Sequence, residues 1–511
     1  NSCYFSTAHH GCKYWWIEWG GRMDTVHDTE QIKRELWKVV YGIWDYIKNS
    51  GKYPEMKNYT LEWVGTIPGK RESRRMKGLY TLTQNDIVSQ RHFADAVSYG
   101  GWAIDLHPAD GVYAAGSACN QWHSKGVYQI PWRCFVGDEV ENLFFAGRII
   151  STSHVANGST RVMCTGAHGA EAVGTAAALC LGNGQSPADY AAPEKASELR
   201  LALEESGHFV PGFAESDSSN LLNSAAATAS STWHFRGFRA DSFRRLERPA
   251  ALALPLCGKV PAFSLSIVAE KDTVLRAELR TSTKVGNYTP EKTLDVKEIS
   301  VSAGEGTAVV KFDAEIPELQ YCFLTLNANP DISVGVSDAL ATGVVTVFNQ
   351  KNEAVSNKGR QVADGNGFES FEFWCPDRRP EAKNLALEFA APVELYSTEL
   401  FRNAYKRPYV ATNAWASAPE ERPERISRMI LFFDTDFDHA METVQMGHPE
   451  SVMPQCVGNY RIFDGNGRMI YERTGNYQAV NDIRLNEPIT TDTISIEFDS
   501  PAAMFHVIVR R

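Results

Sequence analysis

Residues 141–180 read ENLFFAGRIISTSHVANGSTRVMCTGAHGAEAVGTAAALC, and this segment governs the expected architecture. The apolar run 143–150 predicts a buried strand, a glycine-bearing loop follows it, and the small residues after Arg161 predict a helix. A helix rich in glycine and alanine packs very close to a sheet or a ligand, because little side-chain volume lies between them. Its small residues are Gly166, Gly169, Ala170, Gly174 and Ala177.

The amino end of this helix is suited to an electron-rich ligand. Unpaired N–H groups around Arg161 to Cys164 carry about half a positive charge through the helix dipole, which favours a ring oxygen or a phosphate. Arg148 and Arg161 add formal positive charge at the same place. Core packing alone also accounts for a generic small-residue helix, so the wider sequence context decides between the two interpretations.

The segment resembles the closing FAD-contacting motif of FAD-dependent oxidoreductases related to glutathione-reductase-type flavoproteins, some of which are labelled putative xanthan lyases. The resemblance spans residues 1–185 and is carried by further blocks in the same order. These blocks are Tyr14–Gly21, Val40–Lys48, Arg71–Thr83, Gly101–His107 and Tyr128–Arg133.

The resemblance implies FAD as the cofactor, with the strand ending beside the flavin and the helix pointing its amino end at the ring. The residues that it implies for flavin contact are Gly147, Arg148, Ser151, His154, Arg161, Val162, Met163 and Gly166. Two features depart from the superfamily pattern. Arg148 stands where an acidic residue is usual, and no Gly-x-Gly-x-x-Gly follows an early strand to hold the pyrophosphate. We therefore expect the dinucleotide-binding half of the family to lie before Asn1.

The catalytic candidates are His107 and Arg133. His107 follows a strand that bears Asp105, and histidine exchanges protons near neutral pH, although a surface or supporting role is the alternative. Arg133 ends an apolar run and is expected to point inward. The basic cluster Arg71, Arg74 and Arg75 suits a carboxylate or the FAD pyrophosphate, or else pairs with Glu72.

The rest of the chain predicts an α/β region followed by two antiparallel β-sandwiches. Residues 30–49 place apolar side chains at three- and four-residue steps, typical of an amphipathic helix. Short apolar runs at 59–66, 102–106 and 128–132 indicate strands. We expect a partial FAD-binding and substrate domain at 1–185, a linker with a short helix at 186–225, and sandwiches at 226–404 and 405–511. Alternation at Phe263, Leu265 and Ile267, and an Asp-Gly-Asn-Gly turn after Phe463, indicate the antiparallel strands.

Composition excludes several other classes of function. The formal charge of −11 disfavours nucleic acid as a partner, and no apolar stretch reaches the ~20 residues of a membrane span. The ten cysteines show no paired spacing, so we predict no metal of the zinc type and expect Cys119 and Cys134 to be inert thiols. The acidic charge and the sandwich tail favour a periplasmic or extracellular bacterial protein.

Three functions follow from these features. The first is an FAD-dependent oxidoreductase that acts on a carbohydrate or another polar organic substrate by hydride transfer to flavin. The second is a carbohydrate-binding or cell-surface protein in which Trp233, Trp374 or Trp415 serves as a sugar platform. The third is a polysaccharide lyase of the xanthan type, although no residue spacing assembles a lyase base beside a uronate-binding group.

Overall fold

The computed structural model divides the chain into two compact units. Unit 1 comprises Asn1–Ser124, Tyr128–Pro193 and Lys351–Arg360, and unit 2 comprises the remainder. The described residues are 17–122, 125–214, 217–230, 234–287, 290–339, 341, 344–348, 355–356, 383–394, 414–419, 423–433, 456–499 and 504–511. Within these ranges, 347, 355–356, 394, 414–419 and 505 are described by their backbone alone.

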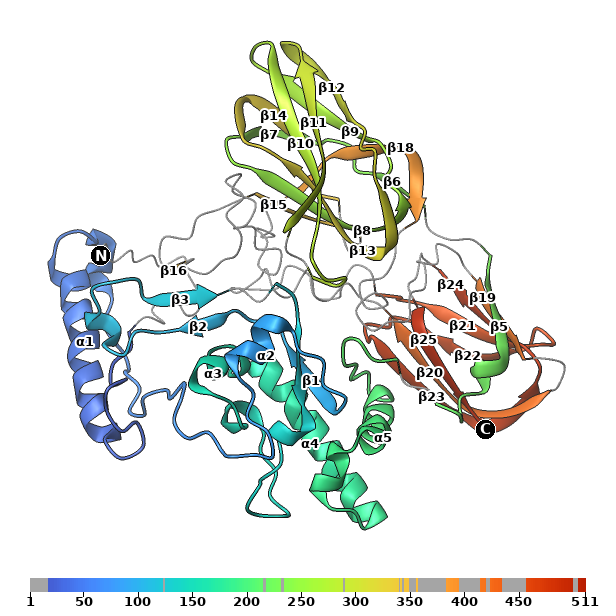
Figure 1. The fold of residues 1–511 in the computed structure, drawn as a ribbon, viewed down its shortest axis with the longest axis horizontal. Helices are drawn as coiled ribbons and strands as arrows, with labels where there is room; N and C mark the ends of the chain where they lie inside the picture. The colour runs from blue at the N-terminus through green and yellow to red at the C-terminus, as the bar shows by residue number, and fades with distance from the viewer. Residues whose placement is uncertain are drawn as a thin grey trace. The chain divides into compact units, whose positions relative to one another are not determined.

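Unit 1 is a mixed α/β region in which small sheets are accompanied by helices (Figure 1). Its α-helices are α1 (Thr29–Asn49), α2 (Gln84–Ser89), α3 (His154–Thr160) and α4 (Met163–Asn183). Its short 3-10 helices are η1 (Pro54–Asn58), η2 (Gly111–Tyr113), η3 (Trp132–Cys134), η4 (Gly147–Ile149) and η5 (Pro187–Ala191). Antiparallel strands β1 (Ala96–Gly100) and β4 (Tyr128–Pro131) form one sheet, and β2 (Ile104–Leu106), β3 (Cys119–Trp122) and β16 (Val355–Ser356) form another.

Helix α1 confirms the amphipathic pattern predicted for residues 30–49. The predicted strand at 59–66 is wrong, because none of these residues forms a strand. The carbonyl groups of this segment instead accept hydrogen bonds from side chains of α1: Trp37 Nε1 donates to Gly65 O at 2.9 Å, and Lys48 Nζ donates to Tyr59 O at 2.6 Å. A segment whose carbonyls are satisfied in this way does not need a strand ladder.

The predicted strand at 143–150 is also wrong. Only Phe144 forms an isolated bridge, to Val136, and residues 147–149 make the 3-10 helix η4. The segment is anchored by single backbone bonds, among them Phe145 N to Phe135 O at 2.7 Å. The predicted helix is confirmed as α4, which begins at Met163. A separate short helix, α3, precedes it, because Val162 adopts an extended conformation between the two.

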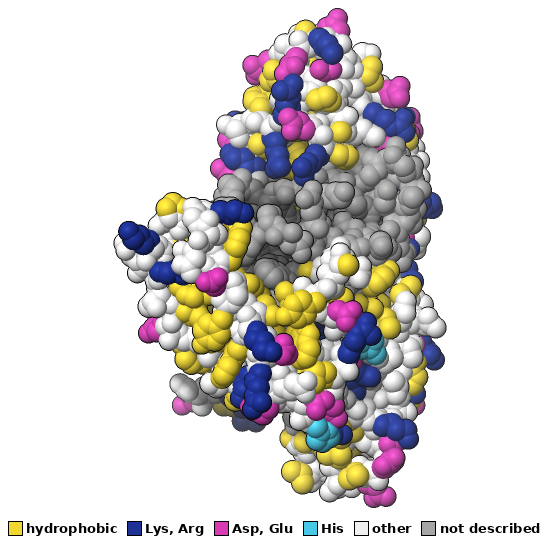
Figure 2. All heavy atoms as spheres, turned by 90° about the vertical axis from the view of Figure 1, so that its left-hand side faces the viewer, with side chains coloured by type: hydrophobic (Ala, Val, Ile, Leu, Met, Phe, Trp, Pro, Cys, Tyr) yellow, Lys and Arg dark blue, Asp and Glu magenta, His cyan; other side chains and the backbone are white. Residues whose placement is uncertain are grey.

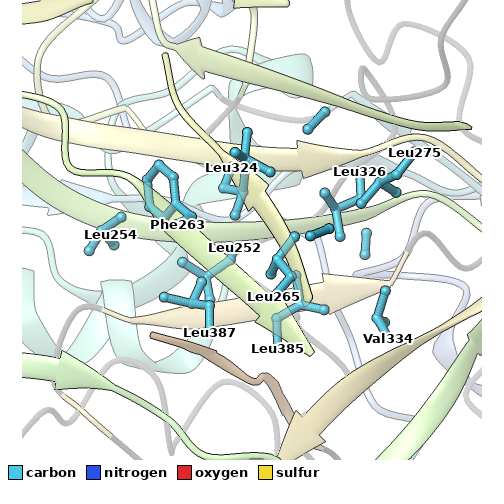
Figure 3. Close-up of a cluster of buried hydrophobic side chains, with 14 of the residues drawn as sticks. Leu252, Leu254, Phe263, Leu265, Leu275, Leu324, Leu326, Val334, Leu385 and Leu387 are labelled. Atoms are coloured by element: carbon cyan, nitrogen blue, oxygen red, sulfur yellow. The ribbon is translucent and has the colours of Figure 1, made fainter. Parts of the chain in front are cut away.

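The first sandwich of unit 2 encloses a large apolar core between two sheets. The five-stranded sheet has the order β11 (Lys292–Val301), β10 (Thr273–Thr281), β13 (Glu315–Leu326), β8 (Ala250–Lys259) and β15 (Val345–Phe348). The facing sheet has the order β17 (Asn384–Leu385), β14 (Asn329–Ser337), β9 (Phe263–Ala269), β18 (Leu387–Glu394) and β6 (His234–Gly237), with β12 (Gly304–Val310) on β9 and β7 (Ser242–Leu246) on β14. Figure 3 shows leucines of β8 and β13 meeting Phe263 and Leu265 of β9. Every second side chain of β9 is buried, as the alternation predicts.

The second sandwich pairs a five-stranded sheet with a three-stranded sheet. The first has the order β22 (Met469–Arg473), β21 (Tyr460–Asp464), β24 (Ile494–Phe498), β19 (Ala414–Pro419) and β5 (Ala225–Ala229), and the second has the order β23 (Val480–Thr491), β20 (Glu424–Phe433) and β25 (Met504–Arg510). The predicted hairpin around Asp464 is confirmed by the pairing of β21 with β22. Asp464 Oδ1 accepts from Arg468 N at 2.9 Å and closes the turn.

The part of the segment 186–225 that belongs to unit 2, from Glu194 onward, contacts the second sandwich. The segment contains α5 (Pro193–Glu204) and η6 (Leu221–Ser224), and Phe209 packs with Phe432 of β20. Glu205 pairs with Arg428 at 2.7 Å and with Arg510 at 2.9 Å. Strand β5, which begins at the end of this segment, belongs to a sheet of the second sandwich.

Replacing Tyr460 with Phe is expected to lower the free energy of unfolding by about 1–3 kcal/mol. The buried Tyr460 hydroxyl lies 2.8 Å from Asn481 Oδ1, and its removal leaves that amide oxygen without this donor inside the core. Calorimetry of the full chain measures the change. Tyr477→Phe is the control because Tyr477 is 65% exposed, and equal effects of the two substitutions would contradict the prediction.

The predicted fold class is confirmed: an α/β region precedes antiparallel β-sandwiches. No helix among the described residues is long and apolar enough to cross a membrane. The face shown in Figure 2, on the α1 side, carries groups of hydrophobic side chains between lysines and arginines. Of the proposed sugar platforms, Trp233, Trp374 and the side chain of Trp415 lie outside the described residues.

Candidate functional site

A network of alternating charges in unit 1 surrounds His107. Its two ring nitrogens face two carboxylates: Nδ1 lies 2.7 Å from Glu18 Oε2, and Nε2 lies 3.2 Å from Asp105 Oδ2. Arg71 pairs with Glu18, and its Nη1 lies 3.0 and 2.8 Å from the two ring nitrogens. Arg161 Nη2 lies 3.2 Å from Asp105 Oδ2. We call these five residues the His107 network.

Burial and charge act in opposite directions on the groups of this network. Burial alone lowers the pKa of His107, but hydrogen bonds to Asp105 and Glu18 raise it above its ordinary value. For Glu18 and Asp105, burial opposes ionisation, yet the hydrogen bond and the charge of His107 hold each pKa below its usual range. The network therefore stabilises the protonated form of His107 and the ionised forms of both carboxylates relative to the same groups in water.

Arg161 connects this network to the amino end of α4. It ends α3, and the next residue, Val162, is the N-cap of α4 with no side-chain hydrogen bond to the first turn. Met163 and Cys164 of the first turn are exposed, and Thr165 is buried. The uncapped N–H groups of a long helix carry partial positive charge and suit an electron-rich ligand atom.

Gly147 and Gly166 allow a very close approach between η4 and α4. A Cβ atom on Gly166 would lie 3.2 Å from the Cα atom of Gly147, which is tighter than ordinary packing. Gly147 has a φ of +67°, in the left-handed region that favours glycine. The sequence-predicted residues 147, 161, 162, 163 and 166 thus gather at one helix end.

The other predicted flavin contacts lie around the start of α3. His154 Nδ1 is 2.8 Å from Glu72 Oε2, and Glu72 also pairs with Arg75. Ser151 is fully buried, and its hydroxyl lies 3.0 Å from Thr81 Oγ1, so its side chain is part of the packed interior of unit 1. Arg148 is exposed. Of the predicted basic cluster, Arg71 belongs to the His107 network, Arg75 pairs with Glu72, and Arg74 is exposed.

Arg133 makes a bidentate ion pair with the buried carboxylate of Asp95. Its Nε lies 2.8 Å from Asp95 Oδ2 and its Nη2 lies 3.0 Å from Oδ1. The guanidinium also sits over the ring of Tyr80 at 5.1 Å. The Arg133 side chain is 35% exposed and points partly inward. Asp95 and Tyr80, its partners, are not members of the His107 network.

The residues present fit one end of FAD. The partly exposed first turn of α4 and the glycine pair beside it match what a flavin ring edge requires: N–H donors, partial positive charge and room for close approach. The sequence shows no glycine-rich phosphate cradle. These features are of the kind that a flavin ring requires, and they include no group for the pyrophosphate.

Sequence reasoning did not find the partners of His107 on other segments. Asp105 and His107 are two residues apart next to a strand, a spacing that places both side chains on one face. Glu18 lies in a loop far away in sequence and carries no such signal. Its role becomes visible only when the fold brings it to Nδ1.

A family model matches the amino-terminal region of the chain, whereas the likeness to solved structures is weak. No curated protein matches the chain. Among solved structures, the family 32 carbohydrate-binding module from Streptococcus pneumoniae EndoD shows 13% identity, covering 20% of this chain and 70% of the module, with a TM-score of 0.16. Allantoicase from Saccharomyces cerevisiae shows 7% identity, covering 57% of this chain and 92% of that chain, also with a TM-score of 0.16. Scores this low carry no conclusion about function. Residues 2–202 match the model of a family described as FAD dependent oxidoreductase, so this region of the chain contains a domain of that family.

Proposed function

We propose that unit 1 supplies the substrate-facing side and the ring-facing helix end of an FAD-dependent oxidoreductase. Its substrate is a polar organic molecule, such as a carbohydrate. The observation that carries this proposal is the link through Asp105: its carboxylate contacts His107 Nε2 at 3.2 Å and Arg161 at 3.2 Å. Asp105 thus links His107, an acid–base group, to Arg161, which immediately precedes the N-cap of α4.

The chemistry divides between the protein and the cofactor. When bound, FAD supplies the acceptor for the hydride that leaves the substrate carbon. Oxidation of an alcohol also releases the hydroxyl proton, and in this proposal the neutral form of His107 accepts it on a ring nitrogen. The carboxylates of Glu18 and Asp105 stabilise the imidazolium that results, which strengthens His107 as a base.

Arg71 gives the network a polar, accessible edge. Its side chain is 40% exposed, while that of His107 is 14% exposed and that of Arg161 is 12% exposed. A guanidinium at the edge of a partly buried base suits a hydroxyl-rich or anionic substrate, because it donates hydrogen bonds and carries positive charge. This supports a polar substrate over an apolar one.

Anaerobic reduction of the flavin tests the proposed function. The purified protein, supplied with FAD, is mixed with sugars, uronates and short hydroxy acids, and the absorbance of oxidised flavin is followed. Loss of that absorbance with one class of substrate supports the proposal. Protein that carries FAD but is reduced by none of these substrate classes contradicts it.

Replacing Gly166 with Val is expected to weaken FAD retention about tenfold or more. The added side chain would push η4 away from α4 at Gly147, and forcing extra volume into a close contact costs about 1–3 kcal/mol. Flavin content after dialysis measures the effect. Gly174→Val on the same helix is the control, since a Cβ there meets no atom within 4 Å, and equal losses from both variants would refute the specific role of the glycine contact.

A further inference from the structure

Three potential metal ligands meet beside the short sheet of unit 1. Asp105 lies on β2, His107 follows it, and Cys119 begins β3. The antiparallel register pairs Leu106 with Asn120, so the next positions, His107 and Cys119, come side by side. One ligand atom from each of the three residues lies within 4.8 Å of the others. The ligands come from two strands, which is why no local spacing in the sequence reveals them.

Asp105 provides a second, independent observation. The residue is only 6% exposed, and its Oδ1 atom has no hydrogen-bond partner among the described residues. Its Oδ2 atom is already engaged by Arg161 and His107. A buried carboxylate oxygen without a partner is costly, and a cation in this position would satisfy it.

The orientation of His107 fits the same interpretation. Histidines that bind metals usually donate the other ring N–H to a carboxylate, which fixes the ring and strengthens the ligand. Glu18 Oε2 lies 2.7 Å from Nδ1 and can play that part. Nε2 faces Asp105 Oδ2 at 3.2 Å and Arg71 Nη1 at 2.8 Å, so binding of a cation to Nε2 requires the Arg71 guanidinium to move away from that nitrogen and keep its pairing with Glu18. Cys119 is 2% exposed, so its sulfur is shielded from solvent.

We propose that Asp105, His107 and Cys119 form a binding site for a thiophilic divalent cation of the zinc type. Tetrahedral zinc holds its ligand atoms about 3.3–3.8 Å apart, given bond lengths of about 2.0–2.3 Å, so the observed cluster needs only a small contraction. The ion replaces one proton on His107 and one on the Cys119 thiol, and the total charge of the cluster with Arg71, Arg161 and Glu18 is conserved. Three protein ligands leave one position for water.

The site goes beyond the proposed function and does not rest on it. A cation on Nε2 prevents that nitrogen from accepting a proton, so the metal-bound protein is an inactive form of the proposed oxidoreductase. Binding itself is measured without turnover. A failure of metal binding and a failure of the oxidoreductase proposal are therefore separate results.

Cobalt titration of the full chain, prepared without a histidine tag, tests the site. Co²⁺ reports a thiolate ligand through a charge-transfer absorption band in the near ultraviolet, and Zn²⁺ is added afterwards as a competitor. We expect one Co²⁺ per chain, the thiolate band, and its loss on addition of Zn²⁺. Absence of stoichiometric Co²⁺ binding overturns the proposal.

Variants then assign the ligands. Cys119→Ser is expected to abolish the thiolate band and to weaken Co²⁺ binding at least 10–100-fold, while Glu18→Gln keeps the band and weakens binding about 10–100-fold. Cys164→Ser, at an exposed cysteine of the same unit, is the control and retains both the band and the affinity. A band that persists in folded Cys119→Ser overturns the assignment. If circular dichroism shows that Cys119→Ser does not fold, Asp105→Asn provides the test. An unchanged affinity of Asp105→Asn for Co²⁺ also overturns the assignment.

Discussion

Replacing Arg280 with Met is expected to lower the free energy of unfolding of the first sandwich by about 3–5 kcal/mol. Arg280 and Glu278 are both 1% exposed and lie on the same strand, β10. The guanidinium donates to Glu278 Oε2 from Nε at 2.9 Å and from Nη2 at 2.8 Å, and its Nη1 donates to Pro290 O at 3.2 Å. Removing the cation leaves a buried carboxylate without its main counter-charge. Loss of one partner destabilises the fold more than replacement of both partners by apolar residues.

Calorimetry of the full chain measures this change. At about 2–4 °C per kcal/mol for a domain of this size, the transition of the first sandwich should fall by about 6–20 °C. Arg276→Met is a matched control, because Arg276 contacts the same carboxylate at 3.1 Å but is 39% exposed and should cost about 0–1 kcal/mol. The double variant Glu278→Leu with Arg280→Met removes both charges and should recover most of the loss. Equal effects of the Arg276 and Arg280 substitutions would contradict the prediction.

The sequence predicts the sandwich strands well because each strand and turn is marked by a pattern within a few consecutive residues. Alternation at Phe263, Leu265 and Ile267 marks the inner face of β9, and the turn residues after Phe463 mark a reversal of the chain. The strands predicted at 59–66 and 143–150 are wrong for a shared reason. Part of their apolar surface stays exposed, as at Trp63 and Leu143, and their backbone groups bond to single side chains or loops. Apolar content alone cannot distinguish these arrangements from a strand ladder.

In the candidate site too, features marked by a local sequence pattern are predictable, and features that depend on contacts between distant segments are not. The amino end of α4 is predictable, because a run of small residues after Arg161 identifies both the helix and its close approach. The His107 network and the cation site are not predictable, because they depend on strand register and on a loop carboxylate. Cys119 illustrates the difference: burial first, and then the Asp105 carboxylate, raise the pKa of this thiol to about 12, which agrees with an inert thiol until a cation displaces its proton.

Replacing His107 with Gln is expected to lower kcat for flavin reduction about 10²–10⁴-fold, the usual contribution of a positioned acid–base group. The glutamine side chain would retain hydrogen bonding toward Glu18 and Asp105 but could not carry a proton. Stopped-flow measurement of flavin absorbance under anaerobic conditions gives the rate. His27→Gln is the matched control in unit 1, since His27 is exposed and its ion pair among the described residues is the local one with Asp24. A rate within twofold of the native protein would remove His107 from the mechanism.

The same measurement separates proton transfer from substrate binding. Arg71 lies at the exposed edge of the network, so Arg71→Gln should raise KM more than it lowers kcat, whereas His107→Gln should act mainly on kcat. Glu18→Gln leaves the base in place but removes a charge that stabilises its protonated form, and a smaller fall in kcat is expected. A purely structural network would instead give parallel losses of both parameters in all three variants. The ordering of kcat losses, with His107 first, Glu18 second and Arg71 last, therefore tests the assignment of roles without knowledge of the natural substrate.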